Sequence, residues 1–572
     1  MFIARIAVIL LSALAFAPSE AAAQPGLLRK TDTSVRKALG RGDTSFRVIV
    51  RAPAACRATI RQSLNAHGDT ILGENTAIGS LTTIVHASDV SALDSNSCVL
   101  SVSDDAILAT HAGPTGGGGG TAVASALRET LGLPVTATGA GVGIGIIDSG
   151  IVSNNDFAGR IVGFYNFLNG GSAYALAGDD YGHGTHVAGL AAGSGALSSG
   201  QYQGVAPGAK LIGMVALDRN GQGRTSDVIN AITFATVNKQ ALGIDVLNLS
   251  LGHPIYESAA TDPLVQAVEL AVRAGIVVIA SAGNFGINQQ TGLSGYGGIT
   301  SPGNAPSAIT VGAFNTNGTI GRGDDVVAPY SSRGPSWYDG YAKPDLVAPG
   351  HRLVADTART TTLYKNYTSL RLNSDYLKLS GTSMAAAVTS GVAALVIQAN
   401  RAANGYPAHP SLTPNAVKAI LEFSAFRMKD SAGVELDHLT QGVGALNAAG
   451  AITLAAAINT AAPVGSWWLM NGVNYSTTIG GSTIGWAQQI VWGDQIVWGD
   501  NIVSANQIVW GDQIVWGDQI VWGDQIVWGD QIVWGDNLVN YWTDVTQIVW
   551  GDIYSSGTVL SNSDVWAALT FP

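Results

Sequence analysis

The stretch GHGTHVAGLAAG (182–193) decides the fold that the rest of the chain is expected to adopt. It places His183 and His186 three residues apart in a run of small residues that favours a helix. Zinc peptidases with two helical histidines use the pattern HExxH, and no glutamate separates these two histidines. A pair of metal ligands is therefore not the favoured interpretation, and the neighbouring motifs must indicate the chemistry.

Three further short motifs flank these histidines: DSG (148–150), SAGN (281–284) and GTSMA (381–385). Taken alone, DSG is typical of a turn and GTSMA of a helix N-terminus. In chain order the four motifs supply a carboxylate, an imidazole, an amide donor and a hydroxyl, which is the set that an acyl-transfer site needs. The sequence therefore predicts a triad of aspartate, histidine and serine, in that order.

Between these motifs, apolar runs alternate with helical patterns. VGIGII (142–147), DVLNLSL (245–251) and IVVIASA (276–282) are uninterrupted, as expected of strands buried on both faces. Alternating strands and helices imply a parallel sheet covered by helices on both sides, which is an α/β fold. Asp148 would then lie at the carboxyl end of a strand, where such sheets place their sites.

The motifs also match a known family across most of this region. The matching stretches include VGIGIIDSGI (142–151), GVAPGAKL (204–211), LNLSLG (247–252), VVIASAGN (277–284), KPDLVAPG (343–350) and LSGTSMAAAVTSGVAAL (379–395). Residues 140–455 thus resemble a subtilisin-like serine peptidase domain of the subtilase family. The resemblance implies a three-layer α/β fold with a parallel central sheet.

The resemblance also implies a role for each motif. Ser383 would be the nucleophile and His183 the base that takes its proton. Asp148 would hold the imidazole and stabilise its cation, and the side-chain amide of Asn284 would donate to the oxyanion. His186 falls one helical turn after the catalytic histidine and is expected to be structural.

Ser250, Leu251 and Gly252 resemble the strand of the family that pairs with the substrate backbone, although an ordinary strand end would have the same residues. No cofactor is required for this chemistry. Structural calcium is possible, because family members often bind it. The sequence contains no ligand run with EF-hand spacing, so the metal content stays unknown.

Two features depart from the family pattern. Ala387 and Val388 occupy the positions where the family usually has proline and then histidine after GTSMA. Neither position belongs to the triad, so the departure affects placement within a subfamily rather than catalysis. Residues 351–379 are more numerous than a minimal member needs, and we expect them to form a surface insertion.

The N-terminal part of the chain predicts export and processing. Residues 1–23 combine a basic start, an apolar run and small residues before Gln24, which is typical of a secretory signal. Residues 24–112 show a β-α-β-β-α-β pattern, which is ferredoxin-like and resembles an inhibitory propeptide of subtilases. The run GPTGGGGGT (113–121) that follows fits a cleavable linker, or a plain spacer.

The two cysteines of the chain, Cys56 and Cys98, both lie in the predicted propeptide. In a ferredoxin-like sheet the last strand runs beside the first, and the two cysteines flank these strands. An exported chain with two cysteines more often pairs them than leaves them free. We therefore expect a disulfide between them.

The C-terminal part is repetitive. The hexapeptide QIVWGD occurs eight times from residue 489 onward, and two degenerate copies keep the same period. Two architectures fit: a β-solenoid, which we favour, or a meander of short strands joined by Gly-Asp turns. A stabilising extension is the plainest role for this module. The boundaries expected from the sequence are 1–23 signal, 24–112 propeptide, 113–139 linker and start of the catalytic domain, 140–455 peptidase domain, 456–485 linker and 486–572 repeat module.

Composition narrows the function further. The formal net charge is −11, which argues against a nucleic-acid partner. No stretch after the signal has the length and hydropathy of a transmembrane helix. We expect a secreted (extracellular, periplasmic or cell-surface) serine endopeptidase that is made as a zymogen, with polypeptides as substrates and its own propeptide as inhibitor. A surface structural or adhesive protein and a transpeptidase are the alternatives.

Overall fold

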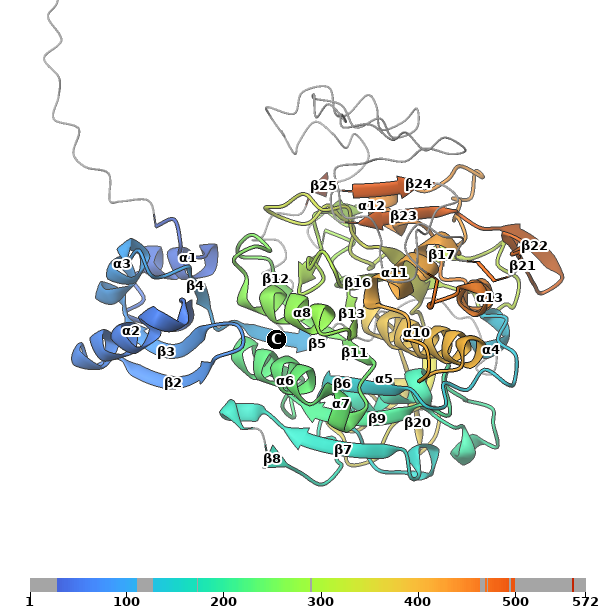
Figure 1. Cartoon of the computed structure of the whole chain (residues 1–572), viewed down its shortest axis with the longest axis horizontal. Helices are drawn as coiled ribbons and strands as arrows, with labels where there is room; N and C mark the ends of the chain where they lie inside the picture. Colours follow the sequence, from blue (N-terminus) through green and yellow to red (C-terminus); the bar gives the residue numbers. More distant parts are fainter. Residues whose placement is uncertain are drawn as a thin grey trace, which may run out of the picture.

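The computed structural model describes residues 28–492, except 111–126, 172, 289–290, 463–468 and 471, together with 495–498 and 558–559. A small N-terminal unit, residues 28–110, lies beside a much larger main body that begins at residue 127 (Figure 1). The last strand of the unit, β5 (Ile107–Thr110), reaches into the main body. The expected signal (1–23) and the glycine-rich run lie outside the described residues.

The N-terminal unit is a four-stranded antiparallel sheet with helices on one face. Its strand order is β2-β3-β1-β4, so that the first and last strands are neighbours. The elements are α1 (Thr33–Arg41), β1 (Ser45–Arg51), α2 (Ala54–Ala66), β2 (Thr70–Asn75), β3 (Ser80–His86), α3 (Ala87–Ser95) and β4 (Ser101–Asp104). Apolar residues of α2 and α3, among them Leu64 and Val90, are buried against the sheet.

Cys56 and Cys98 form a disulfide in this unit, with their Cα atoms 6.0 Å apart. Cys56 lies in α2, and Cys98 lies in the turn that leads to β4. Because β4 pairs with β1, with Val50 opposite Val102, the chain returns to the region from which α2 departs. Pairing of the first and last strands therefore brings together two residues that are 42 positions apart in the sequence.

The main body is built on a central sheet of mostly parallel strands. Their order is β17-β16-β13-β11-β6-β9-β7-β8, with β18 also paired to β16. The strands are β6 (Gly143–Asp148), β7 (Ile161–Asn166), β8 (Ala173–Tyr174), β9 (Lys210–Val215), β11 (Val246–Leu249), β13 (Val277–Ser281), β16 (Ile309–Asn315), β17 (Val326–Val327) and β18 (Leu346–Pro349). The central strands β6, β11 and β13 are buried throughout, as their uninterrupted apolar runs predict.

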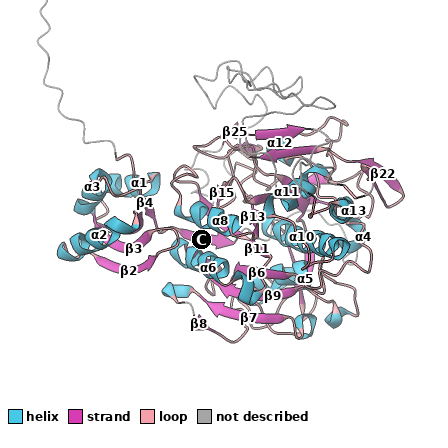
Figure 2. Ribbon diagram, viewed as in Figure 1, coloured by secondary structure: helices cyan, strands magenta, loops and turns pink. Residues whose placement is uncertain are grey.

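Helices cover both faces of this sheet, so the body has three layers (Figure 2). One face carries α5 (His183–Ala192), α10 (Thr382–Asn404), α11 (Pro414–Phe423) and α13 (Ala448–Ala457). The other face carries α6 (Thr225–Val237), α7 (Lys239–Leu242) and α8 (Pro263–Arg273). The predicted α/β fold with a parallel sheet covered on both faces is confirmed. The remaining short helices are α4 (Leu127–Thr130), α9 (Thr362–Asn366) and α12 (His438–Gln441).

The expectation that no stretch after the signal has the length and hydropathy of a transmembrane helix is wrong for α10, which among the described residues is the one helix whose length and composition would suffice to cross a membrane. It lies in the middle of the main body, and its apolar window is 89% buried there. Burial inside the protein explains its apolar composition, because a helix with protein on every side needs no polar face.

The expectation of a surface insertion at residues 351–379 is wrong in part. This segment forms a hairpin, β19 (Leu353–Asp356) and β20 (Tyr376–Leu379), whose connection contains α9 (Thr362–Asn366) and is partly exposed. Asp356, Tyr376 and Leu377 are almost completely buried, because the hairpin packs against α5. The segment therefore helps to hold the helix that carries His183.

The segment expected to be a linker (456–485) is also partly structured. A hairpin of β21 (Ser476–Ile479) and β22 (Ser482–Gly485) ends in Trp486, which is 5% exposed and packs on Phe423 of α11. The indole Nε1 of Trp486 donates to Thr477 at 2.8 Å. Burial of these apolar side chains attaches the hairpin to the main body, so it is not a free connection.

The favoured solenoid does not describe the first two hexapeptide repeats. β23 (Gln489–Trp492) and β24 (Gln495–Trp498) pair in antiparallel register, with Trp492 opposite Gln495. The antiparallel pairing means that the chain reverses between these two repeats, as in a meander, whereas a solenoid would stack coils in one direction. The following repeats lie outside the described residues. A further strand, β25 (Thr558–Val559), pairs with β14 (Gly295–Tyr296).

Candidate active site

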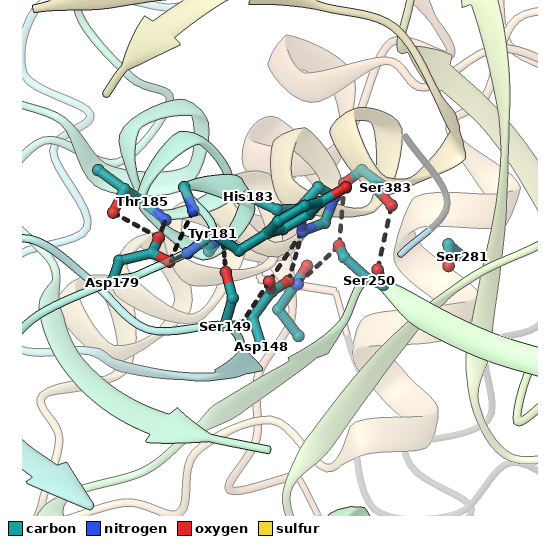
Figure 3. A network of polar contacts seen from close by, with 12 residues as sticks. Asp148, Ser149, Asp179, Tyr181, His183, Thr185, Ser250, Ser281 and Ser383 are labelled. Carbon is teal, nitrogen blue, oxygen red and sulfur yellow. Dashed lines mark hydrogen bonds and ion pairs between the residues drawn. The ribbon is translucent and has the colours of Figure 1, made fainter. Parts of the chain in front are cut away.

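Asp148 and His183 meet where the central sheet ends. Asp148 is the last residue of β6, and His183 is the first residue of α5. The imidazole Nδ1 lies 2.8 and 2.9 Å from the two carboxylate oxygens, and both side chains are fully buried (Figure 3). Because Nδ1 faces the carboxylate, it carries the imidazole proton, and Nε2 is left as the basic nitrogen.

Two side chains that the sequence analysis did not single out fix the start of α5. Gly182 has φ 104° and no side chain to cap the helix, and Asp179 supplies the cap instead. Its carboxylate accepts from Gly182 N at 2.7 Å and from the backbone N–H and hydroxyl of Thr185 at 2.9 and 2.7 Å. Ser149 accepts from Gly184 N at 3.0 Å. An aspartate shortly before a predicted helix start is the signal that could have indicated this cap.

Ser383 lies in the first turn of α10 and is fully buried. Its hydroxyl donates to the carbonyl oxygen of Ser250 at 3.1 Å, and the hydroxyl of Ser250 donates back to the carbonyl oxygen of Ser383 at 3.0 Å. Within the described residues, His183 Nε2 has no hydrogen-bond partner. A rotation of the Ser383 hydroxyl from Ser250 towards His183 would give Nε2 the proton that the chemistry requires.

Asn248 and Ser390 support this pair of serines. The side-chain nitrogen of Asn248 donates to the Ser250 hydroxyl at 2.8 Å, and the Ser390 hydroxyl donates to the side-chain oxygen of Asn248 at 3.0 Å. Both residues are fully buried. Buried polar groups need such partners, and here they link β11 to α10. The signal available in the sequence was an asparagine inside an otherwise apolar strand.

Asn284 follows β13 and faces the start of α10. Its side-chain oxygen accepts from the backbone N–H of Thr382 at 3.0 Å and from the Thr382 hydroxyl at 3.1 Å. This fixes the acceptor end of the amide against the helix, so its donor nitrogen points the other way. Asn284 is partly exposed, whereas Ser383 beside Thr382 is buried. The amide is thus positioned as a donor at the edge of the site.

His186 is held by backbone groups rather than by the site. Its Nε2 lies 3.2 Å from the carbonyl oxygens of both Leu353 and Leu377, on the two strands of the 353–379 hairpin. Burial, with a smaller contribution from His183, lowers its pKa to about 3. The ring is therefore neutral and donates from Nε2, which fixes the hairpin on α5.

The residues predicted to bind substrate lie beside a strand of the N-terminal unit. β5 is the middle strand between β10 (Gln222–Arg224) and β12 (Leu251–Pro254), and it is antiparallel to both. Gly252 lies opposite Ala109, and Leu251 lies opposite Thr110. Sequence analysis missed β10, because a three-residue strand at a glycine carries no pattern of its own. β12 also pairs with β15 (Thr300–Ser301).

Two side chains define how β5 fits. Leu108 is fully buried and belongs to the same apolar cluster as Leu251. Tyr181, two residues before His183, forms a side-chain hydrogen bond with Thr110, and burial raises the pKa of its phenol. β5 therefore has one buried anchor and one polar contact close to His183.

The N-terminal unit also contacts the start of α6. Asp105 accepts from the backbone N–H of Ser226 at 2.7 Å and from its hydroxyl at 2.8 Å, at the first turn of α6. The residue before that helix makes no side-chain cap of its own. Arg47 forms an ion pair with Asp105 at 2.6 Å. A residue of the N-terminal unit thus supplies the cap of a helix in the main body.

A buried carboxyl cluster lies at the same interface and consists of Asp32, Asp104, Glu257 and Asp262. Burial and the nearby Asp104 raise the pKa of Asp32 to about 7. Burial and Asp32 raise the pKa of Glu257 well above its usual value. Asp32 belongs to the N-terminal unit and Glu257 to the main body. Each part therefore contributes a carboxyl group with a raised pKa to the interface.

Of the described residues, one group of histidine and aspartate side chains could hold a metal ion, and it includes Asp69, His86 and Asp89. It lies in the N-terminal unit and not at the triad. The carboxylate of Asp148 is instead hydrogen-bonded to the imidazole of His183 and to the backbone N–H of Ser149.

Comparisons with known proteins agree with this geometry. The sequence model of the subtilase family matches residues 139–451. Serine protease AprX of Bacillus subtilis is 41% identical over 308 residues, covering 53% of this chain and 64% of AprX. Subtilisin DY of Bacillus licheniformis is 34% identical over 288 residues, covering 50% of this chain and 84% of that protein.

Among solved structures, fervidolysin from Fervidobacterium pennivorans, described as a keratinolytic enzyme related to subtilisin, superposes with a TM-score of 0.53. The superposition covers 72% of this chain and 61% of fervidolysin, at 22% sequence identity. At this identity the likeness concerns the fold.

Proposed function

Because this chain belongs to the subtilase family and carries a subtilisin-like serine peptidase domain, we propose that it is an exported endopeptidase made as an inactive precursor. In this proposal the N-terminal unit is a propeptide that occupies the substrate cleft. Polypeptides are the substrates, and Asp148, His183 and Ser383 carry the reaction.

The proposed reaction is peptide hydrolysis through an acyl-enzyme. Ser383 Oγ attacks the scissile carbonyl carbon while His183 Nε2 takes its proton and then donates it to the leaving amine. Water, deprotonated by the same nitrogen, releases the acyl group. Asp148 holds Nδ1 and stabilises the imidazolium, and the Asn284 amide donates to the oxyanion. Loss of one such donor typically costs about 10²- to 10³-fold in turnover.

The observation that carries this proposal is the pairing of β5 between β10 and β12. Extended backbone in that position is what a substrate would present, because a peptide can add itself as a strand to exposed strand edges. Its register places Thr110 opposite Leu251. Ser250, the residue before Leu251, accepts a hydrogen bond from the Ser383 hydroxyl at its carbonyl oxygen, so the end of β5 lies next to the proposed nucleophile. We therefore propose that the precursor is cut shortly after β5, before the end of the glycine-rich run at residue 121.

The buried side chain of Leu108 indicates the substrate class. It lies upstream of the proposed cut and is anchored in an apolar cluster. Ile107 on the same strand is about half exposed, which makes its side chain a weaker determinant. Substrates that place a large aliphatic residue where Leu108 lies in the precursor should therefore be preferred.

Expression of the full chain and of its Ser383→Ala variant, followed by N-terminal sequencing of the products, tests the proposal. The unaltered chain should yield a product that begins between residues 112 and 122, and the variant should remain joined. Ser431→Ala, which alters an exposed serine far from the site in sequence, is the matched control and should process normally. Maturation of the Ser383→Ala chain at the same bond, without added protease, would overturn self-cleavage.

A further inference from the structure

A second group of reactive side chains lies in the N-terminal unit and has no role in the proposed peptidase reaction. It consists of His67, Asp69, His86 and Asp89. His67 follows the last residue of α2, Asp69 precedes β2, His86 ends β3 and Asp89 lies in the first turn of α3. The four side chains therefore come from the ends of four elements that meet at one end of the small sheet.

The donor atoms of this group are close together. His67 Nδ1 lies 2.8 Å from Asp89 Oδ1, and His86 Nδ1 lies 2.8 Å from Asp69 Oδ1 and 3.8 Å from Asp89 Oδ2. Asp89 thus connects the two imidazoles. In a tetrahedral site with bonds of about 2.0–2.1 Å, neighbouring ligand atoms are about 3.3 Å apart. Ligand atoms of Asp69, His86 and Asp89 all lie within 4.8 Å of one another, so these three side chains could share one ion, and His67 is linked to them through Asp89.

One oxygen of Asp69 independently indicates a missing ligand. The Asp69 side chain is completely buried, and its Oδ1 accepts from both the backbone N–H and Nδ1 of His86. Its Oδ2 has no hydrogen-bond partner among the described residues. A buried carboxylate oxygen without a partner is unfavourable, and a cation would satisfy it. The backbone hydrogen bond holds the carboxylate in place, as the outer partners of metal ligands commonly do.

The charge of the group also favours a cation. Two carboxylates face each other across two histidines, and within the described residues no lysine or arginine forms an ion pair with Asp69 or Asp89. Both imidazole rings are about half exposed, so an ion could enter from solvent. A divalent ion bound by two neutral imidazoles would neutralise the two carboxylates.

We propose that Asp69, His86 and Asp89 bind one divalent transition-metal ion of the zinc type, with His67, which contacts Asp89, turning in as the fourth ligand. Two imidazoles and two carboxylates are a donor set that suits Zn²⁺, whereas Ca²⁺ and Mg²⁺ prefer oxygen ligands alone. The ion would join α2, β2, β3 and α3 in a unit too small to have a large core. Since it binds the folded unit and not the unfolded chain, it stabilises the fold of that unit. This inference goes beyond the proposed peptidase function and does not depend on it.

Metal binding is tested on the full-length Ser383→Ala chain, in which self-cleavage cannot separate the N-terminal unit. The chain is stripped with a chelator, titrated with ZnCl₂, passed through a desalting column and analysed for bound zinc. We expect one zinc ion per chain. Replacement by Co²⁺ should give visible absorption bands of a four-coordinate site, which hydrogen-bonded ion pairs alone would not produce.

Variants locate the ion. His86→Ala removes one ligand, and Asp69→Asn removes a negative ligand while keeping an oxygen for the backbone N–H of His86; each should weaken zinc binding at least about tenfold. His409→Ala changes an exposed histidine of the main body and is the matched control, which should leave the affinity unchanged. Equal zinc binding by His86→Ala and the parent would overturn the proposal, as would a parent that retains no zinc. The parent titration decides the matter even if a variant fails to fold.

Discussion

Leu108→Ala should release the N-terminal unit from the cleft more effectively than any other single truncation in β5. The Leu108 side chain is fully buried between the two parts of the molecule, in the cluster that also contains Leu251. Truncation of a buried leucine to alanine costs about 2–5 kcal/mol. Taking about 3 kcal/mol and a factor of ten for each 1.4 kcal/mol, the dissociation constant of the cleaved N-terminal fragment should rise roughly 100-fold.

Dilution of the processed but unseparated complex measures this constant. Hydrolysis of a fluorogenic peptide is recorded over a range of protein concentrations, and the concentration at half-maximal specific activity gives the dissociation constant. Ile107→Ala is the control, because Ile107 precedes Leu108 in the same strand but is 51% exposed. Its effect should stay within about threefold, as for most surface changes. Equal effects of the two substitutions, or no effect of Leu108→Ala, would refute the assignment of β5 as an anchored inhibitory strand.

Three other outcomes follow from the same structure. The pKa values of Asp32 and Glu257 are raised in the carboxyl cluster, so the complex holds protons that the separated parts release. The fragment should therefore bind most tightly near pH 4 and progressively more weakly up to about pH 7. Glu257→Gln should flatten this pH profile, and an unchanged slope would contradict the reasoning. A chain that ends at residue 488 should have the melting temperature of the full-length protein. A chain that ends at residue 465 lacks the 476–486 hairpin packed on α11, so its melting temperature should be several degrees lower. Equal melting temperatures of the two shortened chains in scanning calorimetry would contradict a stabilising role for that packing. Thiol labelling of the denatured, unreduced precursor should find no free thiol. Replacing both Cys56 and Cys98 by serine should lower the unfolding free energy of the N-terminal unit by about 2–4 kcal/mol, as measured by urea unfolding monitored within that unit.

The sequence determined the parts of this protein that short stretches specify. The apolar runs of β6, β11 and β13 predicted strands buried on both faces, and the motifs indicated that Asp148 and His183 would meet. Asp148 and His183 are 35 residues apart in the chain, yet each lies at the end of a regular element. A strand end and a helix start are local features, and local residue types encode them.

Tertiary structure decided everything that depends on which distant segments pack together. The hairpin at 353–379 has the composition of a surface insertion but is buried against α5, where it holds His186. Short strands such as β5 and β10 have too few residues to carry a pattern, and only their shared edge gives them a role. The histidines and aspartates between positions 67 and 89 look like separate polar residues until four element ends converge. A chain's local sequence fixes the preferences of each segment, whereas long-range contacts are chosen by the burial of apolar surface and the pairing of buried polar groups over the whole molecule.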